Sequence, residues 1–431
     1  MTTARTYRAL LQTRSAASRG RTLRPTSRLG AIDITTVLYV LAFATFFMPA
    51  SYAVSTTVLN IWKGAVSLTA AIALILYLCT QRISARWSFM MLGIVMYYLV
   101  TRLIMHSDGS YASAMLGVAR VGGFITLLEY GFIRDRERVL LTFLIAGTIM
   151  CAMHYATYLM YQHVPGGMRG ADPSIYTESI DKSMWFFFKH DNGSAFFFLP
   201  VMTGFWYYYF TYKRGLPAVV VFSAATLFMY WSLWTVTAMI ALTVGVIAFI
   251  YIYMGGGGPL QSLTFKLALI IGIAFCLFVI FISTGDIADW LGEVFEKSEG
   301  LSGRGRIWER SINCIKESPW FGSGYENDMT TALRIGKNHC HNIVLQIPYT
   351  GGIITTVLLL IGHLLCDLPK ETRRMKKTKG QLCLLVSIVV FFVMAANDWY
   401  LYVPMPMLLF ILYHYSGYPA SSELESDAED I

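Results

Sequence analysis

Two close arginines and two close histidines lie in one polar stretch of the sequence, residues 303–352. The arginines are Arg304 and Arg306, and the histidines are His339 and His341. Histidine can work as a base near neutral pH, and arginine keeps its charge near a membrane. Long hydrophobic segments flank the stretch on both sides. A polar, charged loop between membrane spans is where a membrane-borne substrate would react.

The spacing of the two histidines also invites a metal site. Catalytic zinc normally has three protein ligands, and no Asp, Glu or Cys lies near the pair at a supporting spacing. The sequence therefore predicts no bound metal. Residues two apart on a helix point to different faces, so only one of the two histidines would share a given site if this segment is helical.

Two helices are expected to position these side chains. Apolar residues from Ile307 to Ile315 fall at helical spacing among charged residues, and Pro319 ends the pattern. This predicts an amphipathic helix that lies either on the outer membrane boundary or on a helix bundle. Its arginines could simply be solvated, as in many basic interfacial helices. A second helix is expected from Asn338 to Tyr349.

The composition indicates a polytopic membrane protein. Of the 431 residues, 55% are hydrophobic and only 14% are charged, whereas a soluble domain carries about 25% charged residues. The net charge of +8 does not require a nucleic-acid partner, because positive-inside topology alone produces a basic excess.

About twelve segments are apolar enough to span a bilayer, which takes about 20 residues each. We therefore predict an all-α fold, a polytopic transmembrane helix bundle with a long, partly helical external loop between the ninth and tenth spans. The candidate spans are 31–50, 62–80, 87–105, 111–132, 139–161, 193–212, 217–234, 235–254, 265–284, 351–368, 381–396 and 399–416.

Basic residues gather in every second loop. With the N-terminus inside, the cytoplasmic side holds the seven arginines of residues 1–30 and the KETRRMKKTKG run at 370–380. This bias places both termini in the cytoplasm. The expected parts are a basic tail (1–30), a transmembrane bundle (31–284) with an external loop at 162–192, a second external loop for the chemistry (285–350), three last transmembrane helices (351–416) and an acidic cytoplasmic tail (417–431).

Other polar residues within or near the spans are further candidates. Arg120 lies in mid-span, where an ionisable side chain is costly, so it should face the bundle interior and bind a substrate or pair with an acid. Asp398, in the turn between the last two helices, could orient Arg304 or His341, or be a plain turn residue. Cys314 and Cys340 could form a disulfide if their loop faces an oxidising side.

The polar stretch resembles the O-antigen ligase and O-antigen polymerase family. The resemblance rests on Arg304-x-x-x-Trp308, Ser318-Pro319, Gly322-x-Gly324, His341-Asn342 and Gly351-Gly352, in this order and spacing. The late external loop and the number of spans agree with it. A weaker match is His190-Asp191-Asn192-Gly193, which resembles an asparagine-containing entry to a span in that family.

The resemblance implies a donor in which a glycan is joined to a polyprenyl lipid through pyrophosphate. Arg304 would then stabilise the charge that develops on the pyrophosphate, and His341 would bind or deprotonate the acceptor hydroxyl. The supporting substrate-binding residues would be Arg306, His339, Asn342, Arg120, Asn192, His190 and Asp398. No cofactor is expected.

One departure from the family pattern favours the polymerase branch. Ligases of this family tend to have an arginine at the outer end of a middle span, whereas residues 231–242 have only the hydroxyls of Ser232, Thr235 and Thr237. The expected function is a polysaccharide polymerase at the outer face of a bacterial cytoplasmic membrane. The alternatives are an O-antigen ligase and a transporter or flippase of lipid-linked sugars. Partners would be the lipid-linked donor, a glycan acceptor, the bilayer and other export proteins.

Overall fold

The computed structural model describes residues 33–51, 53–170, 184–189, 191–283, 304–398 and 403–418. The predicted basic tail, nearly all of the acidic tail, part of each external loop and His190 lie outside these residues. Residues 38–431 form one compact unit, and residues 1–37 form another.

The predicted all-α fold is confirmed: the described residues form helices and no β-strand. A helix lies over each of the twelve predicted spans. The helices are α2 (Ile34–Phe46), α3 (Thr56–Thr80), α4 (Ala85–Val95), the π-helical η1 (Met96–Val100), α5 (Thr101–Ile104), α6 (Tyr111–Arg134), α7 (Arg136–Tyr161), α8 (Gly167–Gly170), α9 (Asp191–Tyr212), α10 (Leu216–Ser232), α11 (Val236–Tyr253), η3 (Pro259–Ser262), α12 (Phe265–Ile282), α14 (Arg304–Glu317), α15 (Asp328–Ile335), α16 (Ile343–Leu364), α17 (Lys370–Arg373), α18 (Lys379–Ala395) and α19 (Met407–Tyr415).

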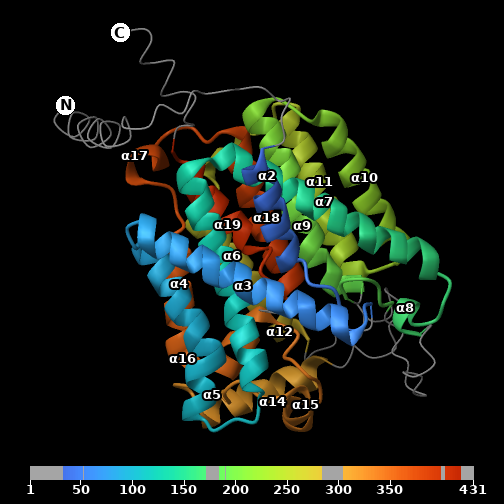
Figure 1. Ribbon diagram of the computed structural model, residues 1–431, viewed down its shortest axis with the longest axis vertical. Coiled ribbons are helices and arrows are strands. Elements are labelled where there is room, and N and C mark those ends of the chain that lie inside the picture. Colours follow the sequence, from blue (N-terminus) through green and yellow to red (C-terminus); the bar gives the residue numbers. More distant parts are fainter. Residues whose placement is uncertain are drawn as a thin grey trace. The chain divides into compact units, whose positions relative to one another are not determined.

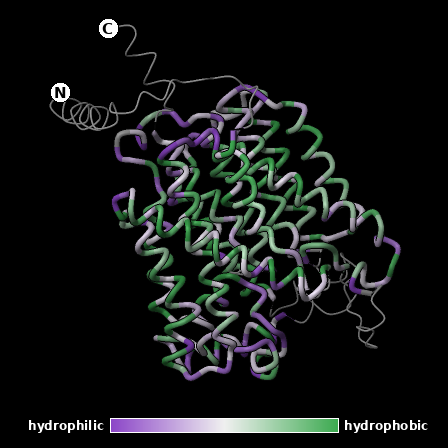
Figure 2. Tube along the Cα trace, viewed as in Figure 1, coloured by the Kyte–Doolittle hydropathy of each residue, from purple (hydrophilic) through white to green (hydrophobic). Residues whose placement is uncertain are grey.

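Seven of the described helices are long and apolar enough to cross a membrane, and α2, α10 and α18 are shorter apolar helices. Hydrophobic residues occupy the middle of the helices, and hydrophilic residues gather toward their ends (Figure 2). The chain is therefore a membrane protein with several spans, while the count of twelve stays a prediction.

The long external loop and the basic loop after α16 lie at opposite ends of the helices. Figure 1 shows α14 and α15 beside α5 at the bottom of the view and α17 near the top. This agrees with the alternation of loops that the sequence predicts. Which of the two ends faces the cytoplasm stays a prediction.

Helix α18 forms the centre of the packing. Its side chains are buried along nearly its whole length, and it contacts α9, α11, α12 and α19. A capping box between Thr378 and Gln381 starts the helix. The turn that follows α18, Ala396–Asp398, is therefore held by the core of the bundle.

Helix α16 is broken at Gly352, where φ is +67°. The break separates the carbonyls of Tyr349 and Thr350 from the amides four residues later, their usual partners in a helix. Ser323 and Gly324 donate to these carbonyls instead, with N–O distances of 2.6 and 3.0 Å.

The two amides left by the break also find partners in the same loop. Ile353 donates to the Pro319 carbonyl at 2.8 Å, and Ile354 donates to the Trp320 carbonyl at 3.4 Å. Buried backbone groups need such partners, above all near a bilayer. The Ser318-Pro319, Gly322-x-Gly324 and Gly351-Gly352 motifs thus join the external loop to the broken helix.

The start of α16 corrects one prediction. A helix from Asn338 is wrong, because the helix begins at Ile343 and residues 338–341 are not helical. The Asn342 side chain accepts a hydrogen bond from the Val344 amide at 2.9 Å and caps the helix. Asparagine is a preferred N-cap because its oxygen satisfies an amide of the first turn.

Candidate active site

His339, His341 and Asp398 meet where the loop before α16 lies against the turn after α18. The Asp398 Oδ1 atom is 3.8 Å from His339 Nε2 and 3.9 Å from His341 Nδ1. The two rings are tilted by 42° to one another, with centroids 3.8 Å apart. Because the segment is not helical, both histidines point into one site, contrary to what a helix would allow.

Exposure separates the roles of the three side chains. His341 is 19% exposed, whereas His339 and Asp398 are 7% and 6% exposed. His341 is therefore the most accessible of the three side chains. The distance of 3.9 Å from its Nδ1 atom to Asp398 Oδ1 is longer than a hydrogen bond.

The backbone between the two histidines is held from both sides. The Cys340 amide donates to Gln346 Oε1 at 2.8 Å, and the Cys340 carbonyl accepts from Trp308 Nε1 at 2.8 Å. His341 itself has a φ of +51°, a conformation that costs energy for a non-glycine residue. The clamp from Trp308 and Gln346 stabilises this conformation.

A hydrogen bond fixes the proton position on His339. Its Nδ1 atom accepts the backbone N–H of His341 at 3.1 Å. A neutral imidazole carries one proton, so that proton must be on Nε2, which faces Asp398. His339 thus presents a donor to the carboxylate and is not arranged as a base.

Arg304 is linked to this site by a hydrogen bond to Asn397, the residue before Asp398. Its Nη1 atom donates to Asn397 Oδ1 at 3.1 Å. Arg304 and Trp308 are four residues apart on α14, so they share the face that packs on α16.

The expected amphipathic helix is confirmed, and its apolar side packs on the bundle. Arg306 lies on the exposed face of α14, and the structure does not bring it to the histidines.

Asn342 is fully buried and ties three helices together. Its Nδ2 atom donates to the Cys276 carbonyl of α12 at 3.1 Å and to the Ala396 carbonyl after α18 at 3.0 Å. Together with the cap of α16, these bonds engage both donor hydrogens of the amide. Asn342 thereby positions the turn that carries Asp398, and its predicted contact with substrate stays a prediction.

Arg120 and Lys189 are basic residues that interact electrostatically with one another. Both are buried. Burial lowers the pKa of Lys189 well below its usual range, the charge of Arg120 lowers this pKa further, and Asp398 opposes the shift. Arg120 and Asp398 therefore both lie within electrostatic reach of Lys189. Asn192 is partly buried in the first turn of α9.

The side chains of His339, His341 and Asp398 are a candidate metal site, because one ligand atom from each lies within 4.8 Å of the others. No carboxylate lies near the histidines in the sequence, but the fold brings Asp398 to them from 57 positions after His341. The tautomer of His339 argues against zinc, because its Nε2 carries the proton while Nδ1 accepts an N–H. As arranged, the group offers two ligands, fewer than the three of a catalytic zinc site.

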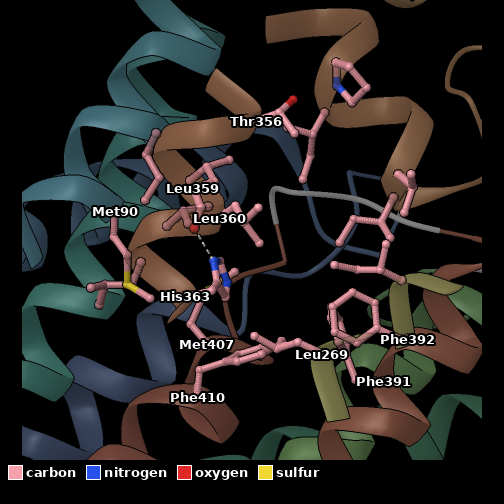
Figure 3. Close-up of a pocket in the computed structure, with 18 residues that line it drawn as sticks. Met90, Leu269, Thr356, Leu359, Leu360, His363, Phe391, Phe392, Met407 and Phe410 are labelled. Carbon is pink, nitrogen blue, oxygen red and sulfur yellow. Dashed lines mark hydrogen bonds between the residues drawn. The ribbon is translucent and has the colours of Figure 1, made fainter. Parts of the chain in front are cut away.

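An apolar cavity of about 230 Å³ begins beside this site. Ile343, Val344 and Ile347 of α16 line it, directly after the residues that form the site. Figure 3 shows Leu359, Phe391, Phe392 and Phe410 around it, with the His363 side chain bonded to the Leu359 carbonyl. The lining comes from α4, α6, α12, α16, α18 and α19, and it is almost entirely hydrocarbon.

Sequence reasoning missed Lys189, Gln346 and Asn397. Lys189 follows four aromatic residues, Trp185–Phe188, and a cation after such a run is a signal that could have been noticed. Nothing in the sequence links Asn397 with Arg304, since 93 positions separate them.

Cys314 and Cys340, considered as a disulfide, are both free thiols.

Residues 199–360 match the family model described as O-antigen ligase. The match runs from α9 into α16, so it includes Arg304, both histidines and Asn342, but neither Arg120 nor Asp398. A search of curated proteins found no match to the chain.

Proposed function

Since residues 199–360 identify the chain as a member of the O-antigen ligase and polymerase family, we propose that it is a membrane glycosyltransferase that polymerises glycan units from a polyprenyl-pyrophosphate donor. The observation that carries this proposal is the meeting of His341, Asp398 and Arg304 at one end of the bundle, beside an apolar cavity. The family supports an activity on glycans; the donor, the polymerisation and the outer face of a bacterial cytoplasmic membrane are proposed.

On the donor side, Arg304 binds the pyrophosphate. Transfer breaks the bond between the anomeric carbon and a phosphate oxygen, and negative charge grows on the departing polyprenyl pyrophosphate. A guanidinium group binds two phosphate oxygens at once, and such contacts strengthen as charge develops. Asn397, which accepts from Arg304 Nη1, holds the group in place before the substrate arrives.

On the acceptor side, His341 is the general base. Its Nδ1 atom faces Asp398, so the carboxylate favours the tautomer with the proton on Nδ1 and the lone pair on Nε2. The acceptor hydroxyl gives its proton to Nε2 as its oxygen bonds to the anomeric carbon. Asp398 then stabilises the imidazolium, and His339, which donates toward the same carboxylate, keeps it oriented. No metal takes part in this scheme.

The apolar cavity suits the lipid part of the donor. Its lining starts at Ile343, one residue beyond Asn342, and is almost entirely hydrocarbon. An isoprenoid chain in this cavity would lie in contact with the bilayer interior while its pyrophosphate reaches Arg304. Burial of apolar surface there adds affinity for the lipid and contributes nothing to the choice of sugar.

Polymerase is preferred to ligase because of residues 231–242. Thr235 donates to the Tyr230 carbonyl, and Ser232 to the Phe228 carbonyl, so this turn offers hydroxyl groups and no cation. In the family resemblance, hydroxyl residues at this place are found in the polymerase branch. Ligase activity is the alternative outcome of the test.

The test is incubation of the purified protein with a polyprenyl-pyrophosphate oligosaccharide. A ladder of products would support the polymerase. A single transfer to an added acceptor would show a ligase, and movement of donor across a vesicle membrane without bond change would show a flippase. Alanine at Arg304 should abolish product without changing folding, and normal product from that variant would overturn the site assignment.

A further inference from the structure

Gln346 is a buried glutamine whose side-chain amide is hydrogen-bonded through both its oxygen and its nitrogen. Its Oε1 atom accepts the Cys340 amide at 2.8 Å. Its Nε2 atom donates to Thr350 Oγ1 at 3.0 Å and to the Tyr97 hydroxyl at 3.4 Å. Because an amide oxygen only accepts and an amide nitrogen only donates, these partners fix the orientation of the group. Its oxygen faces the loop that carries the two histidines.

Tyr97 contacts this glutamine from the π-helical turn η1. At the end of the turn the Thr101 amide donates to the Met96 carbonyl, five residues earlier. Tyr97 and Tyr98 are both buried, and their ring centroids are 4.9 Å apart. Single π turns inside α-helices frequently occur at functional sites. Here the turn carries the tyrosine that meets Gln346.

Close glycine contacts hold the π-helical turn in place. A Cβ atom on Gly93 of α4 would lie 2.6 Å from the Leu359 side chain of α16. A Cβ atom on Gly117 of α6 would lie 2.4 Å from the Tyr98 ring. Small residues permit such close approach between membrane helices. The segment from α4 to η1 thus packs closely on both α16 and α6, so Tyr97 has a fixed position.

Cys340 connects these supports with the candidate base. Besides the bond from its amide, its carbonyl accepts from Trp308 Nε1 at 2.8 Å, and its thiol accepts from Ser311 Oγ at 3.3 Å. Both peptide groups that flank Cys340 are therefore fixed. On the other side of His341, Asn342 is fully buried and caps α16. The backbone of His341, with its φ of +51°, is thus held at both ends.

We propose that Gln346 is a positioning residue of the active site, which sets the direction of His341 through the Cys340 amide. Tyr97 and Thr350 orient Gln346 for this task. The inference rests on the proposed function, because it takes His341 to be the base. A base works only when it is aligned with the reacting hydroxyl. Positioning therefore affects the chemical step and leaves binding of the donor, which other residues perform, unchanged.

The experiment compares full-length wild type with Gln346→Met and Gln381→Met. Methionine is close to glutamine in length, and its thioether is only a weak acceptor. Gln381 is the matched control at the start of α18: it is buried, accepts the Thr378 amide at 3.0 Å and donates to the Ser416 carbonyl at 3.2 Å. Both variants lose comparable hydrogen bonds, so their thermal midpoints should fall by similar amounts.

Turnover of a polyprenyl-pyrophosphate oligosaccharide separates positioning from stability. Gln346→Met should lower kcat by ~10²-fold, because a displacement of about 1 Å can cost that much, while KM for the donor is unchanged. Gln381→Met should keep the kcat of wild type. Gln346→Glu is the conservative variant: its carboxyl group still accepts the Cys340 amide and can accept from the Thr350 hydroxyl. It should restore much of the kcat that Gln346→Met loses.

A second measurement does not depend on the proposed function. Diethylpyrocarbonate modifies accessible, unprotonated imidazole rings, and fragmentation of the modified peptides by mass spectrometry gives the rate at each histidine. Once released from the Gln346 bond, the 19% exposed His341 should react faster in Gln346→Met than in wild type or Gln381→Met. His106, an exposed histidine before α6, should react alike in all three proteins.

The outcomes separate the two proposals. If wild type forms no product from the donor, the proposed function fails, and the reactivity of His341 still tests whether Gln346 holds it. If wild type is active and Gln346→Met keeps the kcat of Gln381→Met, the positioning role fails. A rise in KM without a fall in kcat, or an unchanged reactivity of His341, would also overturn it.

Should Gln346→Met fail to elute as a monodisperse protein, Thr350→Val takes its place. It removes the 3.0 Å partner of Gln346 Nε2 and nearly preserves the side-chain volume. The kcat should fall while KM stays the same, and an unchanged kcat would then overturn the proposal.

Discussion

His341 combines three local features that seldom occur together. It has a positive φ, it is more exposed than its two polar neighbours, and a carboxylate faces one of its ring nitrogens. Strained backbone often occurs where a side chain must take a functional direction. Here the strained backbone turns both histidines toward Asp398, an arrangement that a helix would not give.

Replacement of His341 by alanine should reduce turnover by about 10²–10⁴-fold, the usual contribution of a general base. Folding should be unaffected, because the Trp308–Cys340 bond uses backbone atoms of a different residue. The rate of product formation and the elution profile measure the two effects. His106→Ala, at an exposed histidine of the loop before α6, is the control; an equal loss there would exclude a specific role for His341.

At the residue scale the sequence identified the candidate site residues better than the residues that hold them in place. Arg304, His341 and Asp398 stood out by type and position. Gln346 and Asn397 did not, because Gln346 acts on a backbone amide and Asn397 acts on Arg304, which is distant in sequence. The N-cap role of Asn342 was missed, because the helix was expected to start at Asn338, although asparagine directly before an apolar run is a common helix start.

At the scale of elements, the break in α16 is what fixes the external loop. Four hydrogen bonds between the 319–324 and 349–354 segments replace those lost from the helix. The apolar spans were predictable because lipid-facing helices need long apolar runs. The break was not, since a glycine pair in a span is compatible with a straight helix, and only the docked loop stabilises the positive φ.

Gly352→Ala should detach the loop from α16. Its φ is +67°, and a Cβ there would run into the Trp320 carbonyl. Both the strain and the clash oppose folding, so thermal stability and activity should fall together. Gly255→Ala is the matched control, because Gly255 also has a positive φ but open space around it. A drop in stability no larger at 352 than at 255 would argue against the docking.

The carboxylate of Asp108, in the loop between α5 and α6, holds the start of helix α15. Asp108 accepts from the Asn327 amide and the Thr330 hydroxyl, and these bonds, Thr330 first, lower the pKa of Asp108. A lowered pKa means that this stabilisation is present above the unfolded-state pKa of about 3.9 and is lost as the pH falls through the folded-state pKa.

Asp108→Asn should therefore increase hydrogen exchange in residues 328–335 at neutral pH. Below the folded-state pKa the wild type is also protonated, and the two proteins should exchange alike. Hydrogen exchange followed by mass spectrometry across pH measures this. Equal exchange at neutral pH would mean that the contact does not hold α15.

At the scale of the whole molecule, a buried ion pair holds the bundle together away from the site. Arg86 of α4 binds Glu129 of α6 through two contacts of 2.6 Å, and the Tyr415 hydroxyl of α19 donates to the same carboxylate at 2.7 Å. Glu129 is nine positions beyond Arg120 on α6, or roughly 13 Å along a helix axis. Three helices are thus joined at a point separate from the chemistry.

Glu129→Gln leaves the Arg86 charge buried without its carboxylate, which should destabilise the fold by about 3–5 kcal/mol. The thermal midpoint in detergent should fall, while KM for the donor should be unchanged in the protein that remains folded. Arg138→Gln, which breaks an exposed pair with Asp135, should have almost no effect. A changed KM with an unchanged midpoint would contradict a structural role for Glu129.

The hydrogen bonds that join the external loop to the broken α16 constrain how the chain is made. Residues 319–324 are synthesised before residues 349–354, so the loop has no partner when it is made. Helix α16 can then enter the bilayer as a continuous helix whose own hydrogen bonds are complete. The break forms only when Gly322 and Gly324 reach it, and assembly of the active site becomes a late step of biogenesis, after membrane insertion.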